Sequence, residues 1–255
     1  MEQLERRALA ARSQHYLRET ARRGAAFERV GAFACTFDAV SDNPYVNYAI
    51  PDDGAMPARE NIEALVARFE KRRRRPRLEY LPDAAPQVET ALLAAGFRAE
   101  GKFPVMTCGQ NDVGSVAPPN GIGVLEAATE DDFVSGSAAQ AEAFGSDVPR
   151  PEWLRRTANG GGVVMLACDA ASGLCAGAGS CMKPVDGVSE LGGIGVRHAY
   201  RRQGIAGALT SALTHAILAK GASLVWLTPG HDEAGRVYAR AGFAKACEAL
   251  HVARD

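Results

Sequence analysis

The same order of elements occurs twice along this chain, and this repeat constrains the possible folds more than any other sequence feature. In the first half, a predicted helix at 61–73 precedes an apolar strand, LEYLP, and a helix that ends in AAGF. In the second half, a predicted helix from Ile205 precedes LVWLTP and a helix that ends in RAGF. The intervals 82–96 and 229–242 differ in length by one residue. A duplicated fold explains this similarity; two chance A-G-F helix ends are the alternative.

The longest interruption of the apolar pattern divides the chain close to its middle. The segment 109–121, GQNDVGSVAPPNG, concentrates Gly, Pro, Asn and Ser, which is typical of a loop or linker. A length of 255 residues suits one or two compact cores. We therefore expect a first domain at 1–110, a linker at 111–121 and a second domain at 122–255.

Helices and strands alternate on both sides of this linker. Before it, the pattern predicts helices at 1–23, 61–73 and 86–95 and strands at 33–37, 45–50, 78–81 and 102–108. After it, the pattern predicts helices at 129–144, 152–157, 205–221 and 232–241 and strands at 123–128, 163–169, 174–183, 188–196 and 224–227. Thr129 and Asp232 are the expected N-caps. Turn residues at 172–173 and 186–187 predict an antiparallel meander.

Composition excludes several classes of protein. Hydrophobic residues make up 47% and charged residues 23%, as in soluble globular proteins, and a net charge of −1 gives no overall attraction to nucleic acid or to an anionic membrane. The segment 1–23 lacks the apolar core of a signal peptide, and no later segment approaches a membrane span. The six cysteines form no C-x-x-C pair and are placed as buried, reduced thiols are. We therefore expect a cytoplasmic protein without a metal site.

A basic run, KRRRRPR at 71–77, raises the question of nucleic-acid binding. It follows the predicted end of a helix, where cations complement the helix dipole. No aromatic interleaving or recognised nucleic-acid module accompanies it. We therefore expect this run to contact an acidic partner or the other half of the chain, with no nucleic acid bound.

The segment 196–209, VRHAYRRQGIAGAL, leads from a predicted strand through an arginine-rich turn into a helix without a capping side chain. The small residues Gly204, Ala206 and Gly207 allow a ligand to approach backbone N–H groups. The helix dipole, together with Arg201 and Arg202, favours a pyrophosphate at this position. An ordinary turn with solvated arginines is the alternative interpretation.

Arg201-Arg202-Gln203-Gly204-Ile205-Ala206 resembles the R/Q-x-x-G-x-G/A loop of the GNAT superfamily of acyl-CoA-dependent N-acyltransferases. That family places this loop after its fourth strand and ends with a Tyr-x-x-x-Gly-Phe helix, which is similar to YARAGF at 238–243. The resemblance covers 123–255 and implies an α/β (α+β) fold with a mixed, mostly antiparallel sheet flanked by helices. Together with the repeat, it implies tandem GNAT-like folds. The first is degenerate, because Leu92 replaces Tyr238 and the R-x-x-G-x-A loop is absent.

The resemblance also implies where acetyl-CoA binds. The backbone N–H groups from Arg202 to Gly207 would hold the CoA pyrophosphate, and the glycines at 192–193 suit a bulge that opens the fourth strand away from the fifth. A plain packing role for these two glycines is equally compatible with the sequence. His231 occupies a position where the family often has an asparagine that touches the CoA arm, and this departure puts that contact in doubt.

Three groups would carry the chemistry in such an enzyme. Glu190 corresponds to a glutamate that deprotonates the amine through water, and Tyr238 to a tyrosine that protonates the departing thiolate. The N–H of Gly195, Val196 or Arg197 would polarise the thioester carbonyl, and the sequence does not choose among the three. A half-exposed strand carboxylate and a core tyrosine are the structural alternatives for the first two.

Acetyl transfer from acetyl-CoA to a primary amine, by direct attack in a ternary complex, is the function that we expect. The acceptor is a small-molecule or peptide amine, and the protein is a monomer or a homodimer. An acyl-CoA-binding sensor or scaffold without turnover is the alternative. Cys175 and Cys181 have no partner in the sequence that would activate them as nucleophiles, and the absence of G-x-G-x-x-G disfavours dinucleotide binding.

Overall fold

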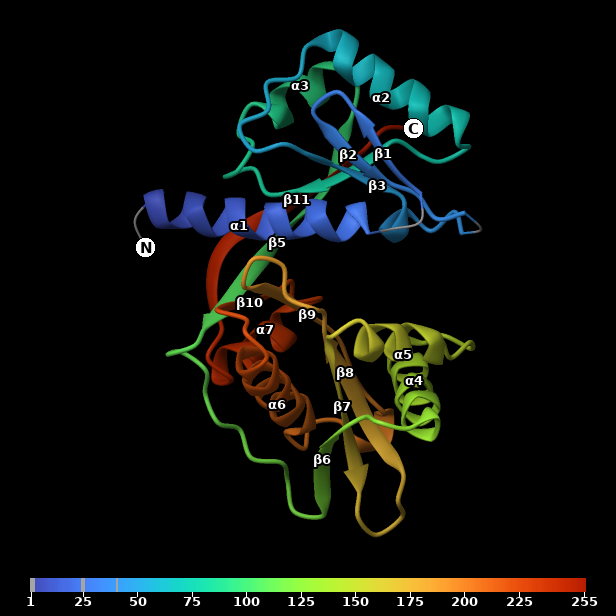
Figure 1. Cartoon of the computed structure of the whole chain (residues 1–255), viewed down its shortest axis with the longest axis vertical. Coiled ribbons are helices and arrows are strands. Elements are labelled where there is room, and N and C mark those ends of the chain that lie inside the picture. Colours follow the sequence, from blue (N-terminus) through green and yellow to red (C-terminus); the bar gives the residue numbers. More distant parts are fainter. Residues whose placement is uncertain (1–2, 24–25, 40) are drawn as a thin grey trace. The chain divides into compact units, whose positions relative to one another are not determined.

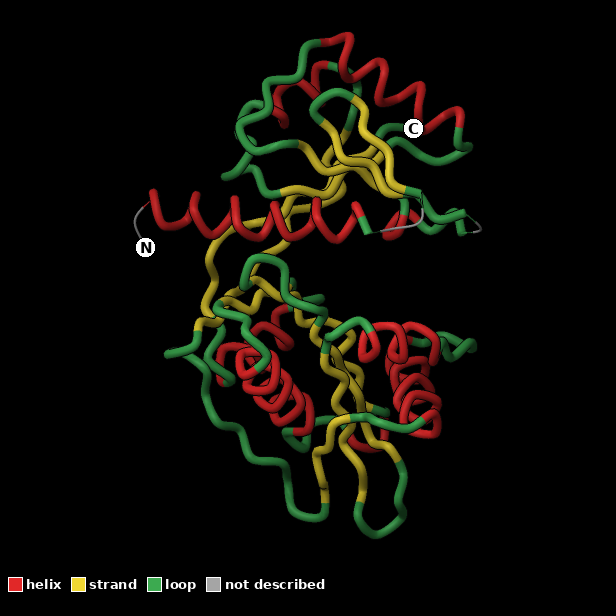
Figure 2. The backbone as a smooth tube through the Cα atoms, viewed as in Figure 1, coloured by secondary structure: helices red, strands yellow, loops and turns green. Residues whose placement is uncertain are grey.

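A computed structural model describes residues 3–23, 26–39 and 41–255, which divide into two compact units (Figure 1). Unit 1 consists of Met1–Val105 and Lys245–Asp255, and unit 2 of Met106–Ala244. Each unit has strands flanked by helices, so the expected α/β (α+β) class is confirmed (Figure 2). Within the part of the chain that the structure describes, no helix is long and apolar enough to cross a membrane.

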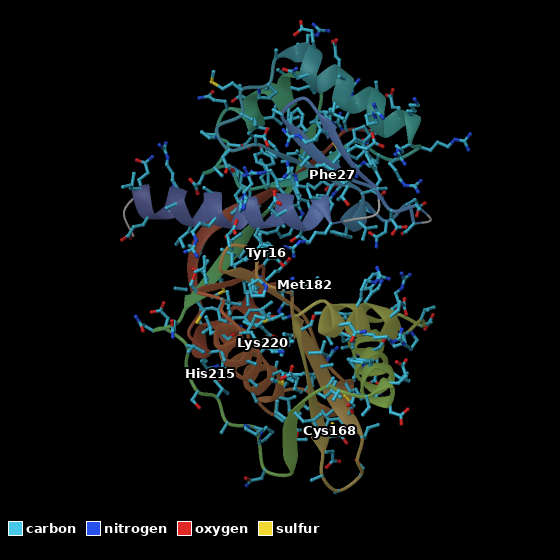
Figure 3. All side chains as sticks on the ribbon, in the orientation of Figure 1. Tyr16, Phe27, Cys168, Met182, His215 and Lys220 are labelled. Atoms are coloured by element: carbon cyan, nitrogen blue, oxygen red, sulfur yellow. The ribbon has the colours of Figure 1, made fainter. Side chains whose placement is uncertain are left out.

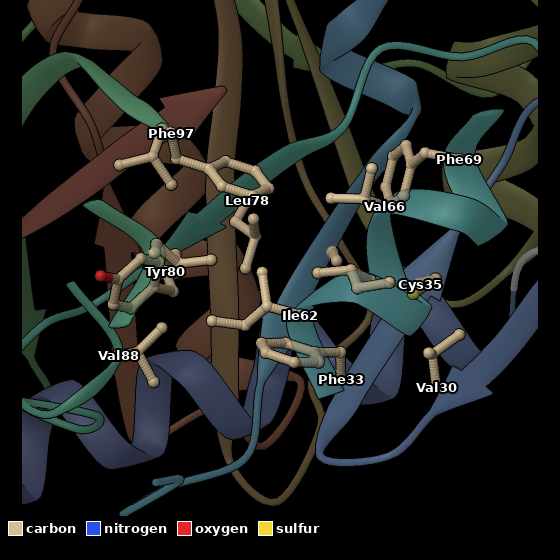
Figure 4. Close-up of a cluster of buried hydrophobic side chains, with 14 of the residues drawn as sticks. Val30, Phe33, Cys35, Ile62, Val66, Phe69, Leu78, Tyr80, Val88 and Phe97 are labelled. Atoms are coloured by element: carbon tan, nitrogen blue, oxygen red, sulfur yellow. The ribbon is translucent and has the colours of Figure 1, made fainter. Parts of the chain in front are cut away.

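Unit 1 has the sheet order β1-β2-β3-β4-β11. Its elements are α1 (Gln3–Arg22), β1 (Phe27–Val30), β2 (Phe33–Thr36), the 3₁₀ helix η1 (Pro44–Val46), β3 (Tyr48–Pro51), α2 (Arg59–Lys71), β4 (Arg77–Tyr80), α3 (Val88–Ala94), the first part of β5 (Arg98–Gly109) and all but the first residue of β11 (Ala244–Ala253). Ile62, Val66 and Phe69 recur at helical spacing on α2 and pack against Phe33 and Leu78 of the sheet (Figure 4).

Unit 2 has the sheet order β5-β10-β9-β8-β7-β6. Its further elements are β6 (Ile122–Glu126), α4 (Glu130–Phe144), α5 (Pro151–Asn159), β7 (Val163–Asp169), β8 (Cys175–Cys181), β9 (Val188–Val196), the 3₁₀ helix η2 (His198–Tyr200), α6 (Ile205–Ala219), β10 (Leu224–Leu227) and α7 (Asp232–Arg240). Leu166 and Ala178 pack in the cluster of α4 and α5, whereas Ala167 and Ala176 pack against α6. The helices α4 and α5 therefore cover one face of this sheet and α6 the other (Figure 1).

The last strand of each sequence half pairs in the unit formed mainly by the other half. Residues 106–109 of β5 pair antiparallel with β10 in unit 2, with Met106 opposite Leu227. In unit 1, β11 pairs antiparallel with β4, with Val252 opposite Leu78. The division expected from the sequence had placed all of 122–255 in the second domain, whereas Lys245–Asp255 belong to unit 1.

Most predicted elements are present to within a few residues, and the turn chemistry is as expected. Asp186 and Gly187 have φ of +47° and +75° between β8 and β9, and Thr129 caps α4 by accepting from the Asp132 N–H at 3.2 Å. The predicted cap of α7 is wrong: the His231 Nδ1 accepts from the Ala234 N–H at 3.2 Å, and Asp232 is the first helical residue. An imidazole can supply the same acceptor that an aspartate would.

Two local differences lie in unit 1. The strand predicted at 45–50 begins only at Tyr48, because the Asn43 side chain accepts from the Tyr45 N–H at 2.9 Å and starts a 3₁₀ turn. The four-residue strand β1, FERV, was not predicted, because half of its side chains are charged and its length is too short to show alternation.

The basic run at 71–77 is tied to unit 1 itself. Arg72 pairs with Glu28, and Arg75 pairs with Glu100 at 2.7 Å. Arg77 is only 2% exposed in its side chain, and its Nε donates to Glu100 at 2.7 Å. These arginines therefore neutralise the charges of carboxylates in their own unit, and most of the run serves the fold of unit 1.

The two halves of the repeat end their second helix in the same way. Gly96 and Gly242 have φ of +85° and +101°. The Phe97 N–H donates to the Leu92 carbonyl, and the Phe243 N–H to the Tyr238 carbonyl, each at 3.1 Å. This six-to-one bond is that of a Schellman motif. Leu92 therefore has the same place in its helix as Tyr238, as the repeat predicts, and it is fully buried.

Replacing these two glycines by alanine separates backbone strain from crowding. Both variants incur the cost of a left-handed alanine, about 1–3 kcal/mol. A Cβ at Gly96 meets nothing within 4 Å, whereas a Cβ at Gly242 would lie 2.0 Å from the Asp112 carbonyl oxygen. We expect Gly242→Ala to lower the free energy of unfolding by at least about 1 kcal/mol more than Gly96→Ala, measured by urea denaturation. Equal losses would show that the segment at Asp112 moves aside freely.

Candidate functional site

The strand β9 diverges from β10 inside unit 2. The two strands pair in parallel over only three positions, ending with Glu190 opposite Trp226, while β9 continues beside β8 to Val196. The β8 register shifts between Ala178 and Ser180, and Gly193 has a φ of +66°. The predicted bulge at the glycine pair is thus confirmed. Because a bulge bends the strand that carries it, the end of β9 is left without a partner on its β10 side.

The ladder between β8 and β9 decides which N–H groups at the end of β9 are free. The Arg197 N–H donates to the Ala176 carbonyl at 2.9 Å. In an antiparallel ladder this bond makes Val196 and Gly177 a non-hydrogen-bonded pair, so the Val196 N–H points away from β8, while the Gly195 N–H points toward β8. Of the three N–H groups that the sequence left open, only that of Val196 faces the side from which β10 has diverged.

The helix α6 begins without any cap. Gly204 has a φ of +92° and no side chain caps the helix. The Arg201 N–H donates to the His198 carbonyl at 3.3 Å, and the next N–H with a backbone acceptor among the described residues is that of Ala208, which donates to the Gly204 carbonyl at 3.1 Å. The N–H groups from Arg202 to Gly207 have no protein acceptor there. Six consecutive free donors at the positive end of a helix can bind an anion, which makes this loop a candidate anion site.

The small residues of this loop have different roles. A Cβ at Gly204 would meet nothing within 4 Å, so this glycine is required by its backbone conformation and leaves the helix start open. A Cβ at Gly207 would lie 3.2 Å from the Val116 side chain. Gly207 therefore also has a packing role against the linker segment, in addition to its expected role of admitting a ligand.

The arginines expected at the site divide into two groups. The Arg201 guanidinium donates to the carbonyls of Val196 at 3.2 Å and of Ala143, near the end of α4, at 2.8 Å. Arg197 donates to the Cys175 carbonyl at 2.7 Å and to Glu142. Both guanidinium groups therefore donate hydrogen bonds to other groups of the protein. The exposed Arg202 side chain has no contact of this kind with the rest of the described chain, so it alone is free for a ligand.

Sequence reasoning did not identify Glu142, which lies near the end of α4. Its carboxylate accepts from the Arg197 guanidinium and, at 3.0 Å, from the His198 N–H. These two interactions hold the pKa of Glu142 below its ordinary value. Glu142 therefore connects α4 to the end of β9, directly before the anion site. No motif marks it, because the contact joins residues that are far apart in the sequence.

Tyr238 lies on the inner side of α7. Its ring packs against the cluster that contains Leu191 and Leu213, with its centroid 6.3 Å from that of Phe243. Burial raises the pKa of its hydroxyl above the ordinary value, so the phenol is protonated at neutral pH. Among the described residues this hydroxyl has no hydrogen-bond partner. A protonated, unengaged phenol in a largely apolar setting can donate its proton to a substrate atom.

Glu190 occupies the point where β9 leaves β10. It is half-buried, and its carbonyl accepts from the Met182 N–H at 3.0 Å. Burial, and to a lesser extent the charge of Glu190, raise the pKa of Cys181 far above that of an ordinary thiol. Cys181 is thus a neutral buried thiol, which agrees with the expectation that it is no nucleophile. The other expected ligands, Gln203 and His231, are exposed; the Gln203 amide donates to the Ala199 carbonyl at 3.3 Å.

The corresponding place in unit 1 has a different surface. Between the start of α2 and α3 lies an open depression of about 340 Å³, lined by Met56, Pro57, Ala58, Gln87, Thr90, Ala91 and Ala94. Its lining contains no cationic side chain, and the Ala58 N–H at the helix start is already bonded to the Asn61 side chain at 2.9 Å. This place lacks the positive charge and the free N–H run of unit 2.

Comparison with known proteins agrees with this geometry. Residues 126–243 match the family model described as the acetyltransferase (GNAT) family. A comparison with curated proteins gives no significant match. Among solved structures, a GCN5-related N-acetyltransferase from Kribbella flavida is 23% identical, with a TM-score of 0.81 over 96% of this chain and 95% of its own.

Two further structures have the same fold over most of their length. A tandem GNAT protein from the clavulanic acid biosynthesis pathway is 15% identical, with a TM-score of 0.62 over 90% of this chain and 83% of its own. A putative acetyltransferase of the GNAT family from Novosphingobium aromaticivorans is 17% identical, with a TM-score of 0.58 over 99% and 97%. The protein thus has the fold of the GNAT N-acetyltransferases, and its residues 126–243 match the acetyltransferase model of that family.

Proposed function

We propose that unit 2 transfers the acetyl group of acetyl-CoA to a primary amine, by direct attack within a ternary complex. The observation that carries this proposal is the run of unbonded N–H groups from Arg202 to Gly207, which begins six residues after the unpaired end of β9. A pyrophosphate on the first feature and a thioester along the second would be joined by the pantetheine arm. The GNAT family match over 126–243 supports acyl transfer as the reaction class.

In this proposal the donor is held mainly by the backbone. The six N–H groups from Arg202 to Gly207 donate to the pyrophosphate oxygens, and the free Arg202 guanidinium adds a charge-assisted bond. Arg201 and Arg197 act indirectly, because their bonds to Ala143, Val196 and Glu142 fix the segment that leads into the loop. The donor site is therefore preorganised by groups that do not themselves touch the ligand.

The chemistry follows from the groups at the open end of β9. The neutral amine nitrogen attacks the thioester carbonyl carbon, and the Val196 N–H stabilises the negative charge that develops on its oxygen. As the C–S bond breaks, Tyr238 donates its proton to the CoA sulfur; its raised pKa keeps it protonated beside a thiol of ordinary pKa about 8.5. Glu190 takes the proton of the amine through water.

A second function uses the same donor site without turnover. A sensor or scaffold would bind acetyl-CoA at Arg202–Gly207 and release no CoA in response to an amine. The unengaged, protonated hydroxyl of Tyr238 favours the enzyme, because a binding module has no use for a proton donor in an apolar setting. Release of free CoA that depends on an added amine separates the two functions.

Thermal unfolding with acetyl-CoA tests the donor site. A ligand at 100 times its dissociation constant stabilises the native state by about 2.7 kcal/mol, so acetyl-CoA should raise the melting temperature of the wild-type protein. Gly204→Glu should abolish this shift, because a carboxylate at the open helix start repels the pyrophosphate. A matched control is Gly221→Glu, which has a φ of +98° and open space at the other end of α6.

The control should lower the melting temperature by a similar amount through backbone strain, yet keep the increase that acetyl-CoA causes. If the wild-type protein shows no shift, the donor assignment is wrong. If both variants lose the shift, the effect comes from weakened folding rather than from the loop.

Variants at the two proposed catalytic residues test the chemistry separately from binding. We expect Tyr238→Phe and Glu190→Gln each to lower kcat about 10²- to 10⁴-fold, measured as CoA release, while the thermal shift with acetyl-CoA remains. Tyr200→Phe is the matched control, since it removes a phenol whose hydroxyl is bonded to Asp169 at 3.0 Å and is not needed for proton transfer. Full activity in both catalytic variants would refute these roles and leave the donor site standing.

A further inference from the structure

Two cysteines of unit 2 lie opposite each other on neighbouring strands. Cys168 near the end of β7 is in register with Cys175 at the start of β8. Both thiols point to the face of the sheet that α4 and α5 cover, where Cys175 belongs to the cluster of Phe133 and Leu154 and Cys168 packs at its margin. Figure 3 labels Cys168 on its strand. The reaction proposed above uses neither residue.

The register places the pair within reach of a disulfide. The Asp169 N–H donates to the Leu174 carbonyl at 2.9 Å, which makes Cys168 and Cys175 a non-hydrogen-bonded pair. In such a pair the Cα atoms are about 4.5 Å apart, inside the range of about 4.4–6.8 Å that disulfides span. The Cys175 Sγ donates to the Gly177 carbonyl at 3.4 Å. Burial raises the pKa of both thiols, and their mutual interaction lowers that of Cys168 and raises that of Cys175 by a smaller amount. The β7–β8 register shifts between Ala167 and Cys168, directly beside the pair, and Cys168 remains opposite Cys175.

Access distinguishes this pair from the other thiols of the described chain. Cys168 is the one cysteine that is partly exposed. The remaining four are buried, each at 3% exposure or less: Cys35, Cys108, Cys181 and Cys247. The interpretation of the cysteines as buried, reduced thiols therefore does not describe Cys168, which is partly exposed and lies opposite a second cysteine.

We propose that Cys168 and Cys175 are a site of reversible covalent modification, at which a low-molecular-weight disulfide converts the two thiols into a cross-strand disulfide. The Cys168 thiolate attacks one sulfur of the reagent, forms a mixed disulfide and expels one thiolate. The Cys175 thiolate then attacks the Cys168 sulfur and expels the second. Two protein thiols are oxidised, the reagent is reduced to two thiols, and the two protons pass to the leaving groups.

A disulfide between Cys168 and Cys175 would form beside the residues of β8 that bind Arg197 at the end of β9. The Cys175 carbonyl accepts from the Arg197 side chain at 2.7 Å, and the Ala176 carbonyl accepts from the Arg197 N–H at 2.9 Å. A disulfide would fix the start of β8 to β7 at the residue that holds Arg197. The modification therefore lies directly behind the strand end that leads into the anion site.

Charge and burial set the rate of this reaction. Burial raises the pKa of both thiols, that of Cys175 to about 11. The carboxylate of Asp132 on α4 further raises the pKa of Cys168, whereas Arg197 lowers that of Cys175. Because the thiolate is the nucleophile, disulfide formation is slow at neutral pH and becomes faster as the pH rises.

Mass spectrometry of the full chain tests the proposal without reference to catalysis. The reduced protein is incubated with glutathione disulfide at pH 7 and at pH 9, and its intact mass and peptide map are recorded without reductant. We expect a loss of two hydrogens, a link between the peptides of Cys168 and Cys175, faster formation at pH 9, and reversal by dithiothreitol.

Single variants show the order of attack. Cys175→Ser should stop at a stable glutathione adduct on Cys168, and Cys168→Ser should neither link nor react at Cys175. The control Cys247→Ser should form the link like the wild-type protein. A persistent glutathione adduct on wild-type Cys168, a link through any other cysteine, or no reaction at pH 9 would each overturn the proposal.

Discussion

The divergence of β9 from β10 is the constraint on which the site in unit 2 depends. Three residues of parallel pairing hold the start of β9, and the bulge at Gly193 turns its end away while β8 remains bonded to it. The hydrogen bonds between β8 and β9 determine which N–H groups of β9 remain free. They leave the Val196 N–H on the edge from which β10 has diverged. The same turn of the strand delivers the chain to the open start of α6. In the proposed reaction, donor binding and carbonyl polarisation thus have one structural origin.

Charge at this site is handled in two ways. Arg197 and Arg201 donate to backbone carbonyls, and Arg197 also to Glu142, so both guanidinium groups hold the segment that leads into the loop. The attraction for an anion rests on Arg202 and on the backbone donors at the helix start, whose partial charges need no counterion. A backbone site of this kind depends on the shape of the loop more than on side-chain identity. This explains why a short motif can mark it.

The sequence contained the local features of the fold and of the loop. Helix periods, the Asp186-Gly187 turn and the helix ends at the two A-G-F segments are decided within a few residues, and the structure confirms them. Other features were beyond reach, because they depend on pairing across the chain. The choice of Val196, the role of Glu142 and the distinction between Arg201 and Arg202 all follow from strand register and from contacts between distant segments. The placement of 245–255 in unit 1 is of the same kind.

The exchange of strands sets an order of events during synthesis. The ribosome completes residues 106–244, the whole of unit 2, before it releases the strand that pairs with β4. Until then the nascent first unit carries an open β edge, a surface on which chains associate wrongly. The end of β5 is synthesised before its partner strand β10, so it is unpaired until β10 has been made. Neither sequence half therefore contains all the strands of one unit, despite the repeat that relates the two halves.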